Sequence, residues 1–532
     1  MGFWRPFRQP ARWATLLAGA VPVLAFPAAN LEFIGWVGLV PGLMLMQRAP
    51  DRREAIIRGC WFGAGYLLAA MYWLAPNLGP GLLLVAILIG LLWSAVGLAV
   101  WSMLRPPITV RRAAAALVVV PSAWLITEWI RSWQGLGGPW AVLGTSQWQH
   151  PAILALAAVG GVWLVSFALV AANTGLVIAL TARSTLVRLT GLAGVVVAIG
   201  AGPLAFALTA PPTADASANE PFTVALVQPG LTPPAAAALR LQRSELLTAR
   251  AAGRADLYVW GESSVGYDLA AQPAMLASIE RLSKSAGAEI LVNQDAANAT
   301  GAKTKQATLI SSAGVEGRYV KTRLVPFGEY IPFRPVLGWL TKISRAAAQN
   351  MVTGTGAHVL HAQLPGRAGS PGRPLAIGVL ICFESAFPDM SRVDTDQGAR
   401  AIIYQTSDST FQASWAPAQH AALGALRAAE TGRPVVQAAL TGDSAAFDAR
   451  GRLLAWAGTS YRGTLLVRLT LPPSSARTLY DRLGDYVPWT AVAIAALAAL
   501  AGLARGASAR RRTGRPAARR QARMPADSKV SG

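Results

Sequence analysis

The chain has 532 residues, of which 53% are hydrophobic and only 14% are charged. A mean hydropathy of +0.39 is too apolar for an ordinary soluble protein of this length, so the composition indicates a membrane protein. The net charge of +22 would suit a nucleic-acid-binding protein, but the basic residues lie in short loops between apolar stretches and in the C-terminal tail. We therefore expect no nucleic-acid partner and attribute the charge to membrane topology.

Eight apolar stretches have about the length that a membrane span needs, roughly 20 residues. They cover residues 12–29, 31–47, 55–75, 80–104, 113–130, 152–181, 187–209 and 487–504. The first is interpreted as a retained span and not as a cleaved signal peptide, because a second apolar stretch follows it at once. Only PAANLE separates these two, which predicts a tight hairpin.

Arginines cluster at the N-terminus and in the loops after the second, fourth and sixth expected spans. The loops PAANLE and APNLGPG, which alternate with these, contain no lysine or arginine. The positive-inside rule then places the basic loops in the cytoplasm and the long segment after the seventh span outside it. The expected division is a membrane domain with about seven spans, a linker, an extracytoplasmic domain, a final span and a basic cytoplasmic tail: residues 1–210, 211–221, 222–475, 487–504 and 505–532.

Within residues 222–475, strand-like runs such as FTVALVQP, AEILVNQD and ARAIIYQTS alternate with helix-like runs such as AMLASIERLSKSAG. This pattern predicts an α/β fold in which helices cover the central sheets. No histidine of this chain follows a metal-ligand spacing such as HExxH, and the two cysteines are far apart. The sequence therefore predicts neither a metal site, nor a cofactor, nor a disulfide framework.

Three polar residues follow strand-like runs of this domain. Glu262 ends LYVWGE, Cys382 ends IGVLIC, and Lys321 follows the expected hairpin LISSAGVEGRYVK. Reactive groups of α/β folds gather where strands end, and a glutamate, a lysine and a cysteine supply a base, a cation and a nucleophile. Taken singly, however, a cysteine after VLI is as well explained by core packing, and each charge by an exposed loop. Spacing alone leaves both interpretations open.

The motifs VWGESS, YVKTRLVPFGEYIP and GVLICFES occur in this order and resemble the carbon–nitrogen hydrolase (nitrilase) superfamily. The block KTRLVPFGEYIPFRP, the later stretch PAQHAALGALRAAETG and the layout of spans resemble the membrane branch of that superfamily, the apolipoprotein N-acyltransferases. The resemblance implies an αββα sandwich beside a multi-pass helical domain. It also implies that Glu262 is the general base, Lys321 the oxyanion-stabilising residue and Cys382 the nucleophile, with Glu329 and Glu384 in support.

The resemblance further implies a substrate pocket that contains Phe327, Phe383, Trp339 and Asp443. Phe327 and Trp339 belong to the run 325–352, which is expected to form an apolar lid at the membrane interface unless it packs on its own domain. The chain departs from the family pattern around this pocket, at Gly261, Phe383, Ser407, Thr410, Leu440 and Asp443. These departures bear on acceptor and donor preference more than on the class of reaction.

The implied activity is the transfer of an acyl chain from a membrane phospholipid, through a cysteine thioester, to the N-terminal amine of a diacylglyceryl-cysteine apolipoprotein. The expected partners are the phospholipid donor, the apolipoprotein acceptor and the membrane, and we expect a monomer in the cell (inner) membrane with its catalytic domain on the periplasmic side. Two alternatives stay open. One is a membrane-anchored amide hydrolase with the same three residues, and the other is a non-catalytic transporter or assembly factor with a degenerate outer domain.

Overall fold

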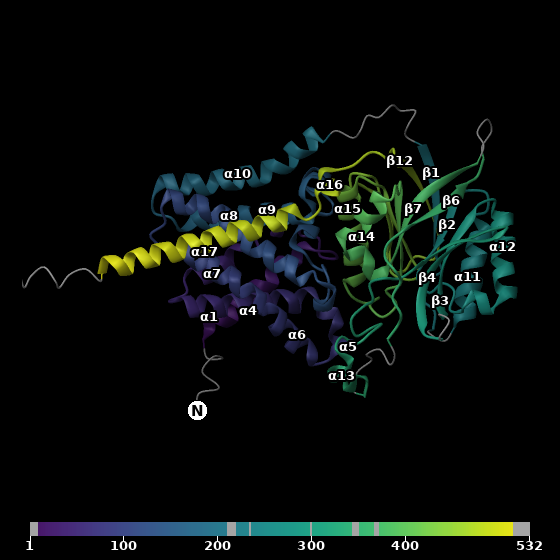
Figure 1. The fold of residues 1–532 in the computed structure, drawn as a ribbon, viewed down its shortest axis with the longest axis horizontal. Helices are drawn as coiled ribbons and strands as arrows, with labels where there is room; N and C mark the ends of the chain where they lie inside the picture. Colours follow the sequence, from purple (N-terminus) through teal and green to yellow (C-terminus); the bar gives the residue numbers. More distant parts are fainter. Residues whose placement is uncertain are drawn as a thin grey trace, which may run out of the picture.

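The computed structural model describes residues 9–209, 220–233, 236–297, 301–342, 350–366 and 372–513. Two parts lie end to end in Figure 1: a bundle of helices built mainly from the N-terminal 208 residues, and a two-sheet domain. The last helix, α17 (Tyr486–Thr513), returns from the sheets along the bundle. The expected linker lies mostly outside the described residues, as does the tail beyond residue 513.

The first two expected spans are interrupted in the structure. Helix α1 (Pro10–Ala20) passes into the 3-10 turn η2 (Val21–Ala25), which contains Pro22. The second stretch divides into α2 (Ile34–Val37) and α3 (Val40–Gln47). Proline removes a backbone donor, and the glycines of the sequence FIGWVGLVPG lower helix propensity, so neither stretch continues as one helix. That these two stretches cross the membrane as a hairpin stays a prediction.

The rest of the bundle consists of longer helices, and five helical stretches of the described chain are long and apolar enough to cross a membrane. They are Gly81–Leu104, which joins α6 (Gly81–Gly90), η4 (Leu91–Trp93) and α7 (Ser94–Leu104), then α8 (Val110–Arg131), α9 (Pro151–Thr181), α10 (Thr185–Leu208) and the first part of α17. Helix α4 (Arg52–Ala70) adds a sixth if it is counted with η3 (Tyr72–Leu74) and α5 (Ala75–Leu78), from which it is bent by 66°. Two short turns, η5 (Gln134–Leu136) and η6 (Leu143–Gln147), follow α8. The number of membrane crossings stays a prediction.

The catalytic part consists of two six-stranded sheets. The first has the order β12 (Gly463–Leu471), β1 (Glu220–Gln228), β2 (Leu257–Trp260), β3 (Glu289–Ala297), β4 (Lys303–Ser311), β5 (Gly314–Val320). The second has the order β11 (Leu453–Ala457), β10 (Ser444–Phe447), β9 (Val435–Ala439), β8 (Ala401–Thr406), β7 (Arg373–Ile381), β6 (Val359–Leu364). In each sheet the three middle strands, β1–β3 and β7–β9, are parallel, and the flanking pairs are antiparallel.

Helices cover both outer faces of the sheet pair, so the predicted α/β fold is confirmed as an αββα sandwich. Helices α11 (Ala237–Arg250) and α12 (Pro273–Ala286) cover the first sheet, and α14 (Pro388–Asp396) and α15 (Ala416–Thr431) lie between the second sheet and the bundle (Figure 1). The side chains of successive residues of β2 point to opposite faces of the first sheet. Val259 belongs to the core shared with the second sheet, whereas Trp260 lies under α11 and donates to Thr248.

The helical bundle and the two-sheet domain contact each other at a break in α9. Gly161 has φ +70°, and a Cβ atom there would lie 2.6 Å from Tyr480 of the short helix α16 (Leu479–Leu483). The backbone N–H of Val162, which the break frees from the helix, donates to the carboxylate of Glu430 on α15 at 2.7 Å. The bundle and the catalytic part are therefore held by specific contacts and not only by the chain connections.

Candidate active site

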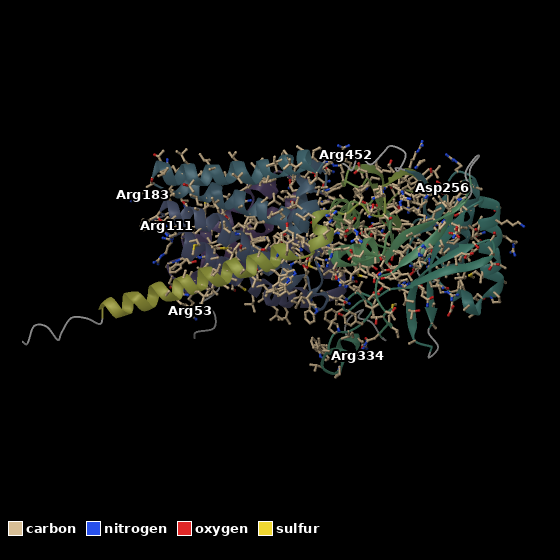
Figure 2. The ribbon with its side chains drawn as sticks, turned by 45° about the horizontal axis from the view of Figure 1, so that its top comes forward. Arg53, Arg111, Arg183, Asp256, Arg334 and Arg452 are labelled. Carbon is tan, nitrogen blue, oxygen red and sulfur yellow. The ribbon has the colours of Figure 1, made fainter. Side chains whose placement is uncertain are left out.

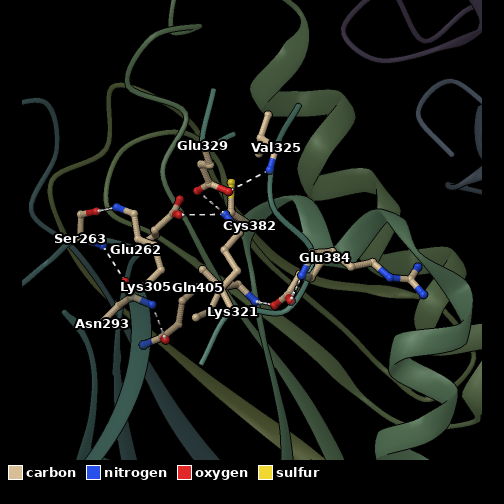
Figure 3. Close-up of polar contacts among 12 residues, drawn as sticks. Glu262, Ser263, Asn293, Lys305, Lys321, Val325, Glu329, Cys382, Glu384 and Gln405 are labelled. Carbon is tan, nitrogen blue, oxygen red and sulfur yellow. Dashed lines mark hydrogen bonds and ion pairs between the residues drawn. The ribbon is translucent and has the colours of Figure 1, made fainter. Parts of the chain in front are cut away.

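Glu262, Lys321 and Cys382 come together beyond the ends of three strands (Figure 3). Glu262 lies two residues after β2, Lys321 directly follows β5, and Cys382 directly follows β7. The first two strands belong to one sheet and the third to the other, so the residues meet at the seam between the two sheets. The structure therefore brings together all three residues that the sequence singled out.

Cys382 has a strained backbone. It separates β7 from the 3-10 turn η9 (Cys382–Ala386), and its φ of +54° is in the left-handed region that side chains other than glycine rarely adopt. Such strain persists only where the surroundings hold it, and it is frequent at reactive sites. The residue as a whole is partly exposed. Cys60, by contrast, lies within the regular helix α4.

Lys321 is completely buried and bonds to two carboxylates. Its Nζ lies 2.7 Å from Oε1 of Glu329 and 3.3 Å from Oε1 of Glu262. The second oxygen of Glu329 accepts from the backbone N–H of Val325 at 2.8 Å. Glu329 thus fixes both the lysine and the loop that follows it, as the resemblance implied.

The charges around the thiol keep the glutamate ionised and the cysteine protonated. Burial alone would raise the pKa of Glu262, but the positive charges of Lys321 and Lys305 and a hydrogen bond from Cys382 hold that pKa below its ordinary value. Burial and the charge of Glu262 raise the pKa of Cys382 well above its ordinary value, although Lys321 opposes this. The resting pair is therefore a carboxylate and a thiol, which suits proton transfer to Glu262 as the cysteine attacks.

Glu384 connects the lysine strand to the cysteine strand. Its Oε1 accepts from the backbone N–H groups of Thr322 and Arg323 and from the hydroxyl of Tyr319, and its Oε2 accepts from the N–H of Ile381. Burial raises the pKa of Glu384, although these four donors stabilise its charged form. The carboxylate thus points to the backbone on either side of the site, and the geometry suits a positioning role.

The turn that carries Glu262 is braced by residues that the sequence did not single out. Ser263 has φ +55°, and its N–H donates to Asn293 at 3.0 Å. Lys305 bonds to the hydroxyl of Ser263 and, at 2.7 Å, to Asp295. Period-two alternation places Lys305 on the same face of β4 as Ala307 and Leu309, which are buried between the sheets. That register is the sequence signal that could have identified the second lysine.

Gly261, a departure from the family pattern, is explained by a close approach. A Cβ atom at this position would lie 1.9 Å from the backbone nitrogen of Leu440, another departure. The backbone segments that carry these two residues touch, so no side chain fits at position 261 here. The two departures are therefore neighbours in space.

The four expected pocket residues lie in different surroundings. Phe383 is buried and packs edge-to-face on Phe387, with ring centroids 5.0 Å apart. Phe327 is half-buried in the loop after Lys321 and has φ +63°, whereas Trp339 is 55% exposed. Asp443 is buried, and burial together with the charge of Asp408 raises its pKa from 3.8 to about 6. Their contact with substrate stays a prediction.

A second buried charge cluster, also missed from the sequence, lies behind the cysteine. His420 on α15 is within 3.0 Å of Asp408, 3.1 Å of the Cys382 carbonyl oxygen and 3.0 Å of the Ser385 hydroxyl. Asp408 lies in TSDSTF and His420 in PAQHAALG, but nothing in the linear spacing connects the two residues. No group of three or more His, Cys, Asp or Glu side chains in the described ranges is placed to hold a metal ion.

Comparison with known proteins agrees with this geometry. Residues 223–476 match the carbon-nitrogen hydrolase family, and residues 18–175 match the apolipoprotein N-acyltransferase N-terminal domain. Among solved structures, a carbon-nitrogen hydrolase from Helicobacter pylori G27 covers 47% of this chain and 89% of its own length, at 14% identity and a TM-score of 0.36. It is the family match over residues 223–476 that identifies the two-sheet domain as carbon–nitrogen hydrolase-like.

Curated relatives extend the match to most of the chain. An apolipoprotein N-acyltransferase from Methylococcus capsulatus is 32% identical over 391 residues, which cover 71% of this chain and 72% of that protein. One from Sinorhizobium medicae is 30% identical and covers 87% of this chain and 90% of its own length, and one from Geobacter metallireducens is 29% identical and covers 91% and 94%. The chain belongs to the apolipoprotein N-acyltransferase family.

Proposed function

We propose that this protein moves an acyl chain from a membrane phospholipid to the α-amine of a diacylglyceryl-cysteine at the N-terminus of an apolipoprotein. The observation that carries the proposal is the meeting of a strained, partly exposed Cys382 with an ionised Glu262 and a buried Lys321. Membership of the family supplies the class of acceptor. The identity of the donor is inferred from the bundle of apolar helices beside the site.

In the first half-reaction, Glu262 takes the proton of the Cys382 thiol while the sulfur attacks the ester carbonyl of the phospholipid. The carbonyl oxygen becomes an oxyanion, which the ammonium of Lys321 and the backbone N–H after the cysteine stabilise. The C–O ester bond then breaks, and the departing alkoxide takes the proton from Glu262. A lysophospholipid leaves, and a thioester on Cys382 remains.

In the second half-reaction, the acceptor amine, in its neutral form, attacks the thioester carbonyl. Glu262 accepts the proton that the amine loses, the C–S bond breaks, and the thiolate of Cys382 recovers a proton from Glu262. The new bond is an amide. Because the donor product leaves before the acceptor reacts, steady-state kinetics should be ping-pong.

The loop after the lysine supports access from the membrane. Phe333 directly precedes the short helix α13 (Arg334–Leu337), Val336 lies within it, and Trp339 lies in the turn η8 (Gly338–Lys342); these side chains are 74%, 72% and 55% exposed. Apolar side chains of this size favour a lipid interface over water. We infer that this segment dips into the outer leaflet. Residues 343–349 of the expected lid lie outside the described residues.

The orientation in the membrane follows from the arginines. Figure 2 shows Arg53, Arg111 and Arg183 at the end of the bundle opposite the two sheets. By the positive-inside rule that end faces the cytoplasm, and the catalytic domain faces the periplasmic side. Reporter fusions near residue 475 should therefore read as extracytoplasmic and fusions after residue 510 as cytoplasmic. A cytoplasmic reading at residue 475 would contradict this orientation and exclude an outer-leaflet donor.

Turnover by the purified full chain in phospholipid vesicles separates this function from its rivals. With phospholipid alone, we expect one equivalent of lysophospholipid and a thioester that mass spectrometry locates on Cys382. With a diacylglyceryl-cysteine peptide added, we expect continuous turnover to the N-acylated peptide. Rapid release of free fatty acid without an acceptor would instead indicate a hydrolase, and no thioester at all would indicate a non-catalytic protein.

A further inference from the structure

His420 occupies an unusual position directly behind the nucleophile. It is 2% exposed, and its two ring nitrogens face different partners. Nδ1 lies 3.0 Å from Oδ1 of Asp408. Nε2 lies 3.1 Å from the carbonyl oxygen of Cys382 and 3.0 Å from the hydroxyl of Ser385. The steps proposed for acyl transfer do not use this histidine.

The partners determine how many protons the ring carries. A carboxylate and a backbone carbonyl oxygen can only accept hydrogen bonds, so each ring nitrogen must donate to satisfy its partner. A neutral imidazole has one N–H and would leave one buried acceptor facing a lone pair. Only the imidazolium donates to both Asp408 and Cys382. The hydroxyl of Ser385 can adapt, because it can either donate or accept.

The surrounding charges favour the same state. Burial alone would lower the pKa of His420, but the charge and the hydrogen bond of Asp408, the bond to the Cys382 carbonyl and the charge of Glu262 raise it above its ordinary value. Of the other charged groups near this pair, Asp443 interacts with Asp408 and carries a raised pKa of its own. Arg427 and Glu430 follow on the same helix and bond to each other. The buried ion pair is thus hydrogen-bonded, as a buried pair must be to persist.

We propose that His420 is an imidazolium that acts as a positioning residue, holding the Cys382 carbonyl and with it the strained backbone of the nucleophile. The C=O and N–H of a trans peptide point in opposite directions. Fixing the carbonyl toward His420 therefore also fixes the direction of the Phe383 N–H, the backbone donor assigned above to the oxyanion. This role deepens the proposed acyl transfer and rests on it, but the charge state of His420 does not.

The resemblance of Ser385, His420 and Asp408 to a serine hydrolase triad has a different meaning here. The Ser385 side chain is completely buried and cannot reach a substrate. The histidine also bonds to the carbonyl of the neighbouring nucleophile, which a general base for serine has no reason to do. The three residues hold the cysteine turn and do not form a second catalytic centre.

The charge state is measured on the full chain in phospholipid bilayers, labelled with ¹⁵N at the histidine ring nitrogens. The chain has four histidines. Solid-state NMR at neutral pH should show one ring with two protonated nitrogens and short contacts to a carboxylate, and this signal should vanish in His420→Gln. A His420 ring with a single protonated nitrogen would overturn the proposal. The wild-type measurement needs no catalysis, so it stands even if the proposed function fails.

The positioning role is measured by the rate of thioester formation. His420→Gln should slow it about 10- to 100-fold, the effect of losing one charge-assisted hydrogen bond, with an unchanged KM for phospholipid. His361→Gln, a matched change at an exposed position of β6, should keep the wild-type rate. In the wild type the rate should fall as pH rises through the point at which the NMR signal loses its second proton. A wild-type rate in His420→Gln would overturn the role.

Ser385→Ala tests which partner of Nε2 matters. It removes the hydroxyl and leaves the Cys382 carbonyl bond in place, so the thioester should form at close to the wild-type rate. A loss of rate as large as that of His420→Gln would mean that the hydroxyl is the functional partner. The proposed role of the bond between His420 and the Cys382 carbonyl would then be wrong. Because the wild-type NMR measurement needs no variant, it still decides the charge state if His420→Gln fails to fold.

Discussion

Two buried charge clusters flank Cys382, and they face different parts of it. The front cluster, Glu262, Lys321 and Glu329, gathers where the sulfur reacts, with the ammonium bonded to both carboxylates. In the rear cluster, Asp408, His420 and Asp443, the histidine bonds to the backbone of the cysteine turn and to Asp408, and the charge of Asp408 acts on Asp443. In the proposed mechanism, therefore, one cluster transfers the proton and the other holds the backbone conformation of the cysteine turn.

The separation has a physical reason. A group that exchanges a proton during the reaction must change charge, and each change alters its hydrogen bonds. If the same group also held the strained turn, the nucleophile would move whenever the proton moved. Placing the holding bonds on His420 and Glu384 leaves Glu262 free to titrate. Substitutions in the front cluster should therefore change chemistry, and those in the rear cluster should change geometry or the later acceptor step.

The largest effect is expected between the clusters, at the nucleophile itself. Cys382→Ala should abolish the thioester and all acyl transfer, because Cys382 is the one of the chain's two cysteines that lies beside Glu262 and Lys321 (Figure 3). Cys60→Ala is the matched control: its sulfur lies in α4, 4.0 Å from the carbonyl of Ile87, and full activity should remain. Mass spectrometry of the phospholipid-treated chain measures both. Wild-type turnover in Cys382→Ala would refute the mechanism.

In the front cluster, Glu262→Gln should slow thioester formation by about 100- to 10,000-fold, the usual range for losing a general base. On the acid side, the wild-type rate should fall only below the ordinary range of a glutamate, because Lys321 and Lys305 hold the pKa of Glu262 down although burial alone would raise it. In Glu262→Gln, this fall of the rate at acid pH should be absent.

Glu289→Gln is the control for Glu262. Glu289 is another buried carboxylate of the same domain; burial raises its pKa to about 7, and it accepts from the backbone of Gln363 rather than from a group of the site. Single-turnover rates from pH 4 to 8 should match the wild type in this variant. A loss as large as that of Glu262→Gln would show that any buried carboxylate of the domain has this effect, and Glu262 would not be the base.

Within the rear cluster, Asp443, unlike His420, should affect the second half-reaction more than the first. Asp443→Ile should slow deacylation by a diacylglyceryl-cysteine peptide by roughly 5- to 150-fold, because it removes a buried carboxylate that can attract the acceptor ammonium. The thioester-forming burst should stay nearly unchanged. Single-turnover measurement of the two steps separates them. Equal losses in both would assign Asp443 to the fold and not to the acceptor.

Much of the fold could be predicted because it depends on long, simple patterns. The long apolar stretches became α8, α9 and α10, and most strand-like runs of the catalytic part became strands. The elements that were missed are short. Strand β6 pairs at an edge of its sheet, and α14 is a nine-residue helix with few apolar residues, so neither has a strong periodic signal. The interruption at η2 followed from Pro22, which the apolar count ignored.

The site residues could be predicted only where the strand end or motif that marks a residue lies next to it in the sequence. The strand ends before Glu262 and Cys382 and the motif around Lys321 have that property, and the structure places the three together. The rear cluster does not: Asp408 follows β8, and His420 lies on α15. Their contact with Cys382 is created by packing of the second sheet against that helix, and no spacing in the sequence encodes it. Lys305 is intermediate, since strand register alone points it inward.

The smallest effect is a change in the pH dependence of stability. Burial and the charge of Asp408 raise the pKa of Asp443 from 3.8 to about 6, so the folded chain holds a proton there that the unfolded chain releases between these values. Stability from this group is complete below pH 3.8 and is lost as pH rises through about 6, at a cost of at most about 3 kcal/mol. Asp443→Asn, which carries no charge at any pH, should remove that slope. Its Tm should exceed that of the wild type at pH 7 and approach it at pH 4, measured at one scan rate in the same detergent. An equal Tm difference at pH 7 and pH 4 would show that burial does not destabilise the ionised form of Asp443. The charges of the rear cluster would then be as well balanced as those of the front cluster.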